Sequence, residues 1–381
     1  MTDKNLFKKV LTFKAGNFLF SRKYDRERLA PLLIRAQTIY ASVASLPILP
    51  EWSSRLETDI IRRSIHGTAA IEGNPLPEER VGELLAQVEP GGLLERSERE
   101  IVNLKTAYAV LAVASKEPFA VTEAYIQDVN ETITYGLATE AHSPGRYRGQ
   151  RVQVGDKAHG GVYTPPKAKA DIARLMVEFV EWINSAEMLA EPTEIRAALA
   201  HYHLGLIHPF GDGNGRAARL LEATILTRSG MRYLPKMLSN FYYRHMDEYF
   251  IAFRAAEKGK NGDVTPFLEF VLTGLLQSVE ELQRNIHVFI CILAFQAMAD
   301  SLRQTHDITQ RQHDLLRILI KNPSRAIALK DLLTDPLFAP LYRRASEQTA
   351  RRDLKRLAGL KLLTKDETGH RLNPRGLDQL P

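Results

Sequence analysis

Apolar residues recur every three to four positions along most of the chain, which is the spacing of a helix face. The helical stretches have clear ends. Gly73, Asn74 and Pro75 end one of them, because glycine and asparagine tolerate the left-handed conformation and proline cannot continue a helix. The pattern predicts helices over about residues 25–45, 51–72, 77–87, 94–115, 121–135, 168–185, 193–206, 214–229, 239–257 and 266–304.

One segment of this region departs from the helical pattern. Residues 143–166 are rich in glycine and proline and contain Val152, Gln153 and Val154, whose apolar and polar alternation suits a short exposed hairpin. We expect this flap to be the one clear β-like element of the first 300 residues. An ordinary edge strand would show the same alternation.

The pattern changes again after about residue 305. Helices near 308–321, 328–334 and 346–359 precede two short strands around a turn at Asp366–Gly369. Three helices followed by a hairpin predict a winged-helix domain. The chain is therefore expected to contain an N-terminal helical region over 1–95, a core over 96–305 and a winged helix over 306–381.

Composition adds limits to this picture. A content of 44% hydrophobic and 25% charged residues is typical of a soluble globular protein. The one cysteine, Cys291, excludes an internal disulfide, and the first residues lack the apolar core of a secretory signal, so a cytoplasmic protein is expected. The apolar run over 288–295 is shorter than the roughly 20 residues that cross a bilayer, so no membrane partner is expected.

The chemistry concentrates in His208–Arg219, with the sequence HPFGDGNGRAAR. Glycines at 211, 213 and 215 let the backbone approach a ligand closely. The predicted helix that follows begins with amides that have no intrahelical partner, so this turn is expected to cradle an anion. A glycine-rich turn with one histidine is more often only a turn, but the charged groups around this one favour a site.

Each polar side chain of the segment suits a phosphate ligand. Arg216 and Arg219 are three residues apart on the predicted helix, so both can clamp phosphates from one face. Asp212 offers a hard oxygen to Mg²⁺, and the amide of Asn214 can donate to a phosphate. His208 is the one group here that can accept a proton near neutral pH, which predicts phosphoryl or nucleotidyl transfer.

The segment resembles the Fic family pattern His-x-Phe-x-Asp/Glu-Gly-Asn-Gly-Arg-x-x-Arg at every specified position, within a similarity that extends over about residues 20–300. The resemblance implies an all-α fold and transfer of AMP from ATP, with Mg²⁺, to a Ser, Thr or Tyr hydroxyl of a protein, which could be the chain itself. It implies that His208 is the base, that Phe210 packs the loop into the core and that Asp212 holds Mg²⁺. It also implies that Gly213, Asn214 and Gly215 cradle the α- and β-phosphates and that Arg216 and Arg219 hold the outer phosphates. Adenosine would lie beside Tyr249 and Phe250. Relatives often carry two tyrosines at the last pair, so the contact of Phe250 is left open.

The stretch from Thr68 to Gly73 resembles the inhibitory pattern Ser/Thr-x-x-x-Glu-Gly/Asn of the same family. The resemblance implies that Glu72 pairs with Arg219 and keeps the γ-phosphate from binding productively. Glu72 also lies in the last turn of a predicted helix, where a carboxylate faces the negative end of the helix dipole, so a compensating cation is expected. A solvated surface glutamate is the competing interpretation. Within the flap, residues 145–163 resemble the family's target-docking hairpin, which would pair with an extended protein segment through Val152, Gln153 and Val154.

The C-terminal region carries most of the net positive charge. Residues 343–361 hold seven Lys or Arg against Glu347 and Asp353, an excess of five in a chain whose net charge is +6. The helix over 346–359 resembles the recognition helix of winged-helix regulators, so DNA is a predicted partner, although many winged helices bind proteins. The sequence also leaves open a regulator that uses the pocket as a nucleotide sensor, removal of AMP, transfer of UMP or phosphocholine, and a homodimer through the helix over 266–304.

Overall fold

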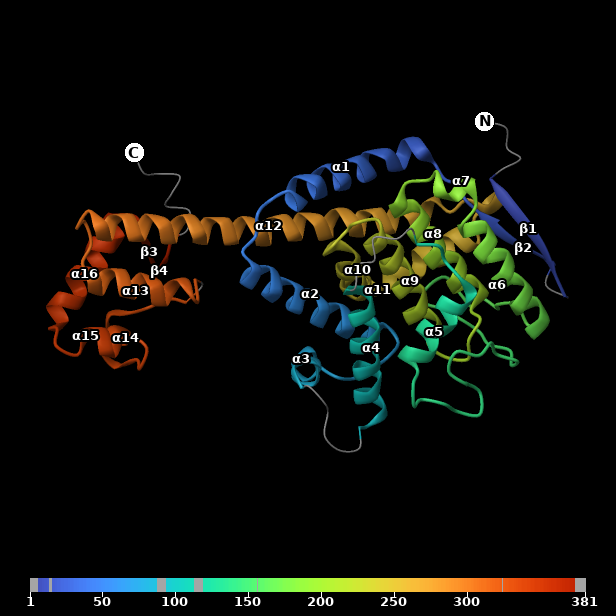
Figure 1. Ribbon diagram of the computed structural model, residues 1–381, viewed down its shortest axis with the longest axis horizontal. Helices are drawn as coiled ribbons and strands as arrows, with labels where there is room; N and C mark the ends of the chain where they lie inside the picture. The colour runs from blue at the N-terminus through green and yellow to red at the C-terminus, as the bar shows by residue number, and fades with distance from the viewer. Residues whose placement is uncertain are drawn as a thin grey trace. The chain divides into compact units, whose positions relative to one another are not determined.

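The computed structural model describes residues 6–13, 16–87, 94–112, 119–155, 157–323 and 325–373 (Figure 1). They form two compact units, Met1–Leu282 and Gln283–Pro381. The division falls within the helix α12, Thr265–Gln304. The domain boundaries expected at 95/96 and 305/306 stay predictions. Residues 113–115 of one predicted helix and Asp156 of the flap lie outside the described residues.

Unit 1 is predominantly helical, as the apolar spacing predicts. The short helix α7 and a 3-10 turn, η2, are additions to the predicted set. The helices of this unit are α1 (Arg26–Ala44), α2 (Pro50–Ile71), α3 (Glu78–Ala86), α4 (Arg96–Ala112), α5 (Glu123–Ile133), α6 (Lys169–Ile183), α7 (Ala186–Leu189), α8 (Thr193–Ile207), α9 (Asn214–Arg228), α10 (Leu234–Arg244), α11 (Met246–Glu257), η2 (Lys260–Gly262) and the first part of α12.

The core of unit 1 surrounds α8. This helix is buried on nearly every side, which its long run of apolar residues and its many alanines permit, and α6 and α9 pack against it. Residues 68–73, which resemble the inhibitory pattern, lie at the C-terminal end of α2, and α2 packs closely along α10. Gly67 makes that approach possible, because a Cβ there would lie 2.9 Å from the carbonyl oxygen of Ser239. The close packing fixes where the C-terminal end of α2, and hence Glu72, lies.

Three sequence-based expectations for unit 1 are corrected. The first 21 residues contain an antiparallel hairpin of β1 (Phe7–Thr12) and β2 (Gly16–Ser21), anchored by the fully buried Phe20, so the flap is not the one β-like element. In the flap itself the described pairing is a single antiparallel bridge between Val154 and Tyr163. The helix predicted over 239–257 is two helices, α10 and α11, because the backbone turns at His245 (φ −125°, ψ 45°).

Within the described residues one helix, α12, is long and apolar enough to cross a membrane by length and composition alone. The expectation of no membrane partner, drawn from residues 288–295, stays a prediction. A core helix of a soluble protein meets the same criterion. In unit 1, α12 contributes to the core the buried side chains of Phe267, Leu268, Val271, Leu272, Leu275 and Val279.

Unit 2 has the order of elements that the sequence pattern predicts, with one short helix, α15, added. After α12 come α13 (Gln310–Ile320), α14 (Leu329–Thr334), α15 (Ala339–Tyr342) and α16 (Glu347–Gly359), and then the antiparallel strands β3 (Leu363–Asp366) and β4 (Gly369–Leu372). Ile327 forms an isolated antiparallel bridge with His370 of β4. Ala350, Leu354 and Leu357 are on the buried face of α16.

Candidate active site

His208 lies at the C-terminal end of α8. Its backbone is left-handed (φ 50°, ψ 57°), and its amide donates to Leu204 at 3.0 Å, so the chain leaves the helix abruptly at this residue. One ring nitrogen bonds to the backbone of Gly205, which orients the imidazole. Burial, reinforced by the positive charge of Arg148, lowers the pKa of His208 to about 4. The ring is therefore neutral at physiological pH and can accept a proton.

The loop after His208 is held from inside. Phe210 is fully buried, and its backbone amide and carbonyl both bond to the side chain of Asn214, each at 2.9 Å. The side-chain amide of Asn214 therefore closes the loop, a role different from the phosphate contact inferred from the sequence. Asn130 of α5 adds a second anchor, because its amide donates to the carbonyl of Asp212 at 2.9 Å.

The first turn of α9 forms an anion site. Gly213 caps the helix with φ 78° and makes no side-chain capping bond, so the first amides of α9 lack a side-chain acceptor from the cap. A Cβ on Gly215 would collide with the carboxylate of Glu72. The Glu72 carboxylate therefore lies directly against the first turn of α9, which is where the helix dipole favours an anion.

Arg219 completes this anion site and binds Thr68 and Glu72. Its Nη2 lies 2.7 Å from Oε1 of Glu72, and its Nε donates to the hydroxyl of Thr68 at 2.8 Å. Burial opposes ionisation of Glu72, but the charges of Arg219 and Arg216 outweigh it and keep the pKa of Glu72 below its usual value. The structure therefore brings together the pair predicted from the sequence.

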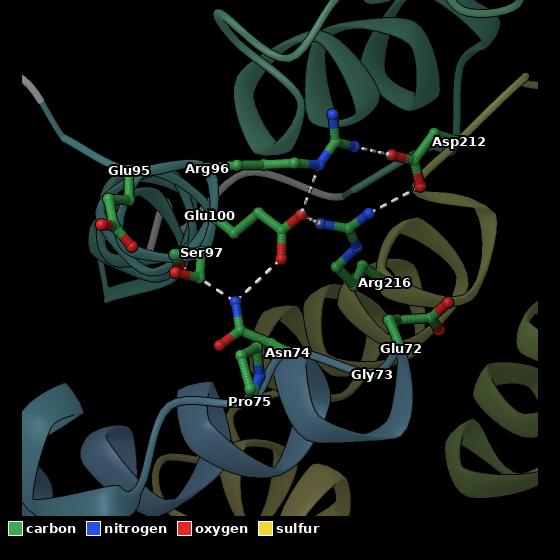
Figure 2. Close-up of a pocket in the computed structure, with 10 residues that line it drawn as sticks. All are labelled: Glu72, Gly73, Asn74, Pro75, Glu95, Arg96, Ser97, Glu100, Asp212 and Arg216. Atoms are coloured by element: carbon green, nitrogen blue, oxygen red, sulfur yellow. Dashed lines mark hydrogen bonds and ion pairs between the residues drawn. The ribbon is translucent and has the colours of Figure 1, made fainter.

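A cavity of about 510 Å³ is lined by Glu72, Asp212 and Arg216 among other residues, as Figure 2 shows, and its lining includes neither Arg219 nor His208. The side chain of Asp212 is 30% exposed there and accepts bonds from Arg216 at 2.7 Å and from Arg96 of α4 at 3.1 Å (Figure 2). Burial acts to raise the pKa of Asp212, but the charge of Arg216 and the amide of Gly213 outweigh it and lower this pKa, so the carboxylate is ionised at neutral pH. The Nε and Nη1 atoms of Arg216 are buried without a hydrogen-bond partner among the described residues, although Nη1 forms a long ion pair of 4.0 Å with Oε1 of Glu100 (Figure 2).

Tyr249 lies in the core beside Arg219, and its contact with adenosine stays a prediction. It is 5% exposed, and its hydroxyl bonds to His201 at 2.9 Å and also to Arg219. His201 in turn bonds to the buried Glu222 at 3.1 Å. Tyr249 thus supports Arg219 from within the core, whereas Phe250 is half-buried and its ring lies 5.6 Å from that of His159 in the flap.

Arg148 joins the flap to the backbone of His208 and is absent from the sequence-based set. This buried guanidinium donates to the carbonyl oxygens of His208 at 2.7 Å, Gln150 at 2.8 Å and Pro166 at 2.8 Å. In the flap, Val154 is paired with Tyr163 by two bonds of 2.9 and 2.8 Å, while Val152 and Gln153 belong to no strand. Arg148 therefore fixes the base of the flap next to the histidine.

These features define a helical domain with a histidine, a glycine loop and a helix N-terminus around an anion site. Residues 120–226 match the model of the Fic/DOC family. The protein adenylyltransferase Fic of Nematostella vectensis is 32% identical over 255 residues, which cover 66% of this chain and 54% of that protein. This chain therefore spans about half the length of the curated relatives it matches.

Solved structures show the same fold. A Fic family protein from Desulfovibrio desulfuricans G20 is 22% identical, covers 90% of this chain and 96% of its own, and has a TM-score of 0.55. Residues 134–508 of Fic-1 from C. elegans are 26% identical, cover 69% of this chain and 76% of their own, and give a TM-score of 0.54. The family model matches residues 120–226, and over these residues the resemblance to the Fic family found in the sequence is confirmed.

Proposed function

We propose that this chain transfers AMP from ATP to a hydroxyl of a protein. The proposal rests on the position of the Glu72 carboxylate, which lies against the first turn of α9 and beside Arg219. A carboxylate that is bound by a helix N-terminus and a guanidinium occupies a site suited to a phosphate. The relatives named as protein adenylyltransferases support this assignment.

The reaction needs one proton acceptor and one phosphate cradle. The oxygen of the target hydroxyl attacks the α-phosphorus of ATP, the bond to the bridging oxygen breaks, and pyrophosphate leaves. His208 is neutral and receives the hydroxyl proton as the new bond forms. The first amides of α9 would hold the phosphate oxygens, and Arg219 would hold the outer phosphate, in place of Glu72.

Asp212 suits Mg²⁺ in this scheme. Its carboxylate is ionised and lines the cavity, and Mg²⁺ is commonly held by one or two carboxylates together with phosphate oxygens and water. Among the described residues there is no cluster of three or more His, Cys, Asp and Glu side chains that could hold a metal unaided. The ion would therefore arrive with the nucleotide and neutralise phosphate charge.

Glu72 makes the enzyme autoinhibited. While its carboxylate occupies the anion site, a γ-phosphate cannot lie beside Arg219, so ATP is not seated for transfer. The ion pair is largely shielded, since the Arg219 side chain is 2% exposed and that of Glu72 is 31% exposed. Removing the carboxylate should free the cradle without removing any group that the reaction uses.

The transfer is tested with ATP labelled at the α-phosphate, a cell lysate and the Glu72→Gly protein. Label is expected on the protein itself or on lysate proteins, and the further change His208→Ala should abolish it. ATP binding without covalent label in Glu72→Gly would contradict transfer and favour a nucleotide sensor. Parallel reactions with labelled UTP and with AMP-modified protein separate AMP transfer from transfer of UMP and from AMP removal.

We also propose that unit 2 is a winged helix that binds DNA. On α16 the apolar face is buried, while Gln348, Arg352 and Lys355 are exposed. Such a helix can divide its cations between bases and phosphates in a major groove. A gel-shift assay with a salt titration should give affinity that falls steeply as salt rises. Absence of salt-sensitive binding to any duplex would leave a protein-docking role.

A further inference from the structure

Two guanidinium groups share the carboxylate of Asp212, the proposed ligand of Mg²⁺ (Figure 2). Nη2 of Arg216 bonds to Oδ1 at 2.7 Å, and Nη2 of Arg96 bonds to Oδ2 at 3.1 Å. Each carboxylate oxygen therefore faces a positive charge. A divalent cation at Asp212 would lie within a few ångströms of both arginines and would be repelled by them.

The two arginines differ in how easily they can leave. The side chain of Arg216 is 3% exposed and lies on the first turn of the helix that follows the loop it binds, so it is fixed by packing. The side chain of Arg96 is 54% exposed and extends from the first residue of α4. The helix dipole disfavours a cation at a helix N-terminus, so Arg96 at the first position of α4 does not stabilise this helix.

Arg96 already has a second acidic neighbour. Its Nε lies 3.6 Å from Oε1 of Glu100, one turn further along α4. Oε2 of Glu100 accepts a bond from the side-chain amide of Asn74 at 2.8 Å, and the same amide donates to the carbonyl of Ser97 at 3.0 Å. Asn74 is two residues after Glu72. The first turn of α4 is therefore bonded to the end of the inhibitory segment and, through Arg96, to the metal-binding carboxylate.

We propose that Arg96 is a regulatory clasp on the metal site: it pairs with Asp212 when no divalent cation is bound, and it moves to Glu100 when a divalent cation enters. The proposal rests on the proposed function, because it concerns the cation that accompanies ATP. In the clasped state two positive charges, on Arg96 and Arg216, offset two negative charges, on Asp212 and Glu100. The move of Arg96 to Glu100 frees Oδ2 of Asp212 for the incoming cation.

The test compares Arg96→Gln with the unsubstituted residue in the full-length Glu72→Gly chain. Electron paramagnetic resonance measures the dissociation constant of Mn²⁺ in the presence of a non-hydrolysable ATP analogue, and a titration measures the Mg²⁺ concentration for half-maximal AMP incorporation. Both values should fall about tenfold in Arg96→Gln, the order of the repulsion of a divalent cation by one nearby charge in water. The tighter Mn²⁺ binding of Arg96→Gln should disappear when Asp212→Asn is added.

Arg80→Gln is the matched control. Arg80 pairs with Glu98 of the same α4 turn at 2.7 Å, and no described contact joins it to Asp212, so its removal should leave both values unchanged. Unchanged or weaker Mn²⁺ binding in Arg96→Gln would overturn the clasp, as would an equal gain in Arg80→Gln. Tighter Mn²⁺ binding in Arg96→Gln without any AMP incorporation would sustain the clasp and reject the proposed function.

Discussion

His208 and Glu72 are the two residues whose surroundings decide the chemistry. His208 is buried, bonded to the backbone of Gly205 and close to Arg148, so it is kept neutral. Glu72 is kept ionised by Arg219 and Arg216 and lies on the first turn of α9. His208 can therefore accept a proton, and Glu72 fills the anion site where the proposed function places a phosphate.

The pH dependence of transfer follows from His208. Because its pKa is lowered to about 4 from an ordinary 6.5, the base stays unprotonated as pH falls through 6.5. The negative charge of Glu72 raises the pKa of His208, so its loss in Glu72→Gly should lower this pKa further. The kcat/KM of Glu72→Gly should therefore be level between about pH 8 and 6, and fall only in more acid solution. An acid limb with an apparent pKa near 6.5 would show that His208 is not in this environment.

Protonation of His208 also bears on stability. A histidine whose folded pKa lies below its unfolded value takes up its proton first in the unfolded chain, so stability is full above the ordinary pKa of 6.5 and is lost as pH falls toward 4. His203, whose pKa burial also lowers to about 4, acts in the same direction. Acid inactivation must therefore be separated from unfolding by following circular dichroism over the same pH range.

The motif alone names His208, Asp212, Arg219 and, with the inhibitory pattern, Glu72. Three further residues around the site could not be found in this way, because their contacts join distant positions. Arg148 reaches a carbonyl 60 residues away, Asn130 one 82 residues away, and Arg96 a carboxylate 116 residues away. Nothing in the local sequence of these residues marks them as parts of one site.

At the scale of elements, the ends of helices make the site. α8 ends at Ile207, just before His208, α9 begins at Asn214, α2 ends beside Glu72 and α4 begins at Arg96. Apolar spacing and the Gly-Asn-Pro stop predict most of these ends. The pattern does not predict the hairpin β1–β2, because two short strands give a weak periodic signal, or the break at His245, because neither glycine nor proline marks it.

The flap depends on one arginine. Arg148→Met keeps the apolar length of the side chain but leaves three carbonyl oxygens without their charged donor. The free energy of unfolding should fall by at least about 2 kcal/mol, and AMP incorporation in the Glu72→Gly background should fall with it. Chemical denaturation measures the first quantity. Arg146→Met, two residues earlier and exposed, should change neither, and equal effects of the two substitutions would reject the role of Arg148.

At the scale of the whole molecule, the candidate site and the basic helix belong to different units. All the residues discussed for transfer lie in Met1–Leu282, whereas α16 lies in Gln283–Pro381. The order of elements in unit 2 follows from helical spacing and a turn signal. The ligand of unit 2 does not follow from the sequence pattern, because a cationic helix face can bind either DNA or a protein.

Charge reversal on α16 should separate the two activities. Replacing Arg352 and Lys355 by glutamate should abolish salt-sensitive duplex binding and leave AMP incorporation by the Glu72→Gly chain within about twofold, because neither residue belongs to unit 1. Gel-shift and labelling assays on the same preparation measure both. Loss of labelling on a lysate target, with duplex binding retained, would instead assign unit 2 to target delivery.

The ratio of initial AMP-incorporation rates, Glu72→Gly over the unsubstituted chain at saturating ATP and Mg²⁺, tests the central claim most directly. If the Glu72 carboxylate occupies the phosphate site, the ratio should be at least about tenfold, equivalent to about 1.4 kcal/mol of released inhibition. The rate of Glu72→Gly should fall to near zero when Arg219→Met is added, because the guanidinium that seats the outer phosphate is then lost. A ratio of one or less, in a Glu72→Gly protein that is folded, would contradict the account.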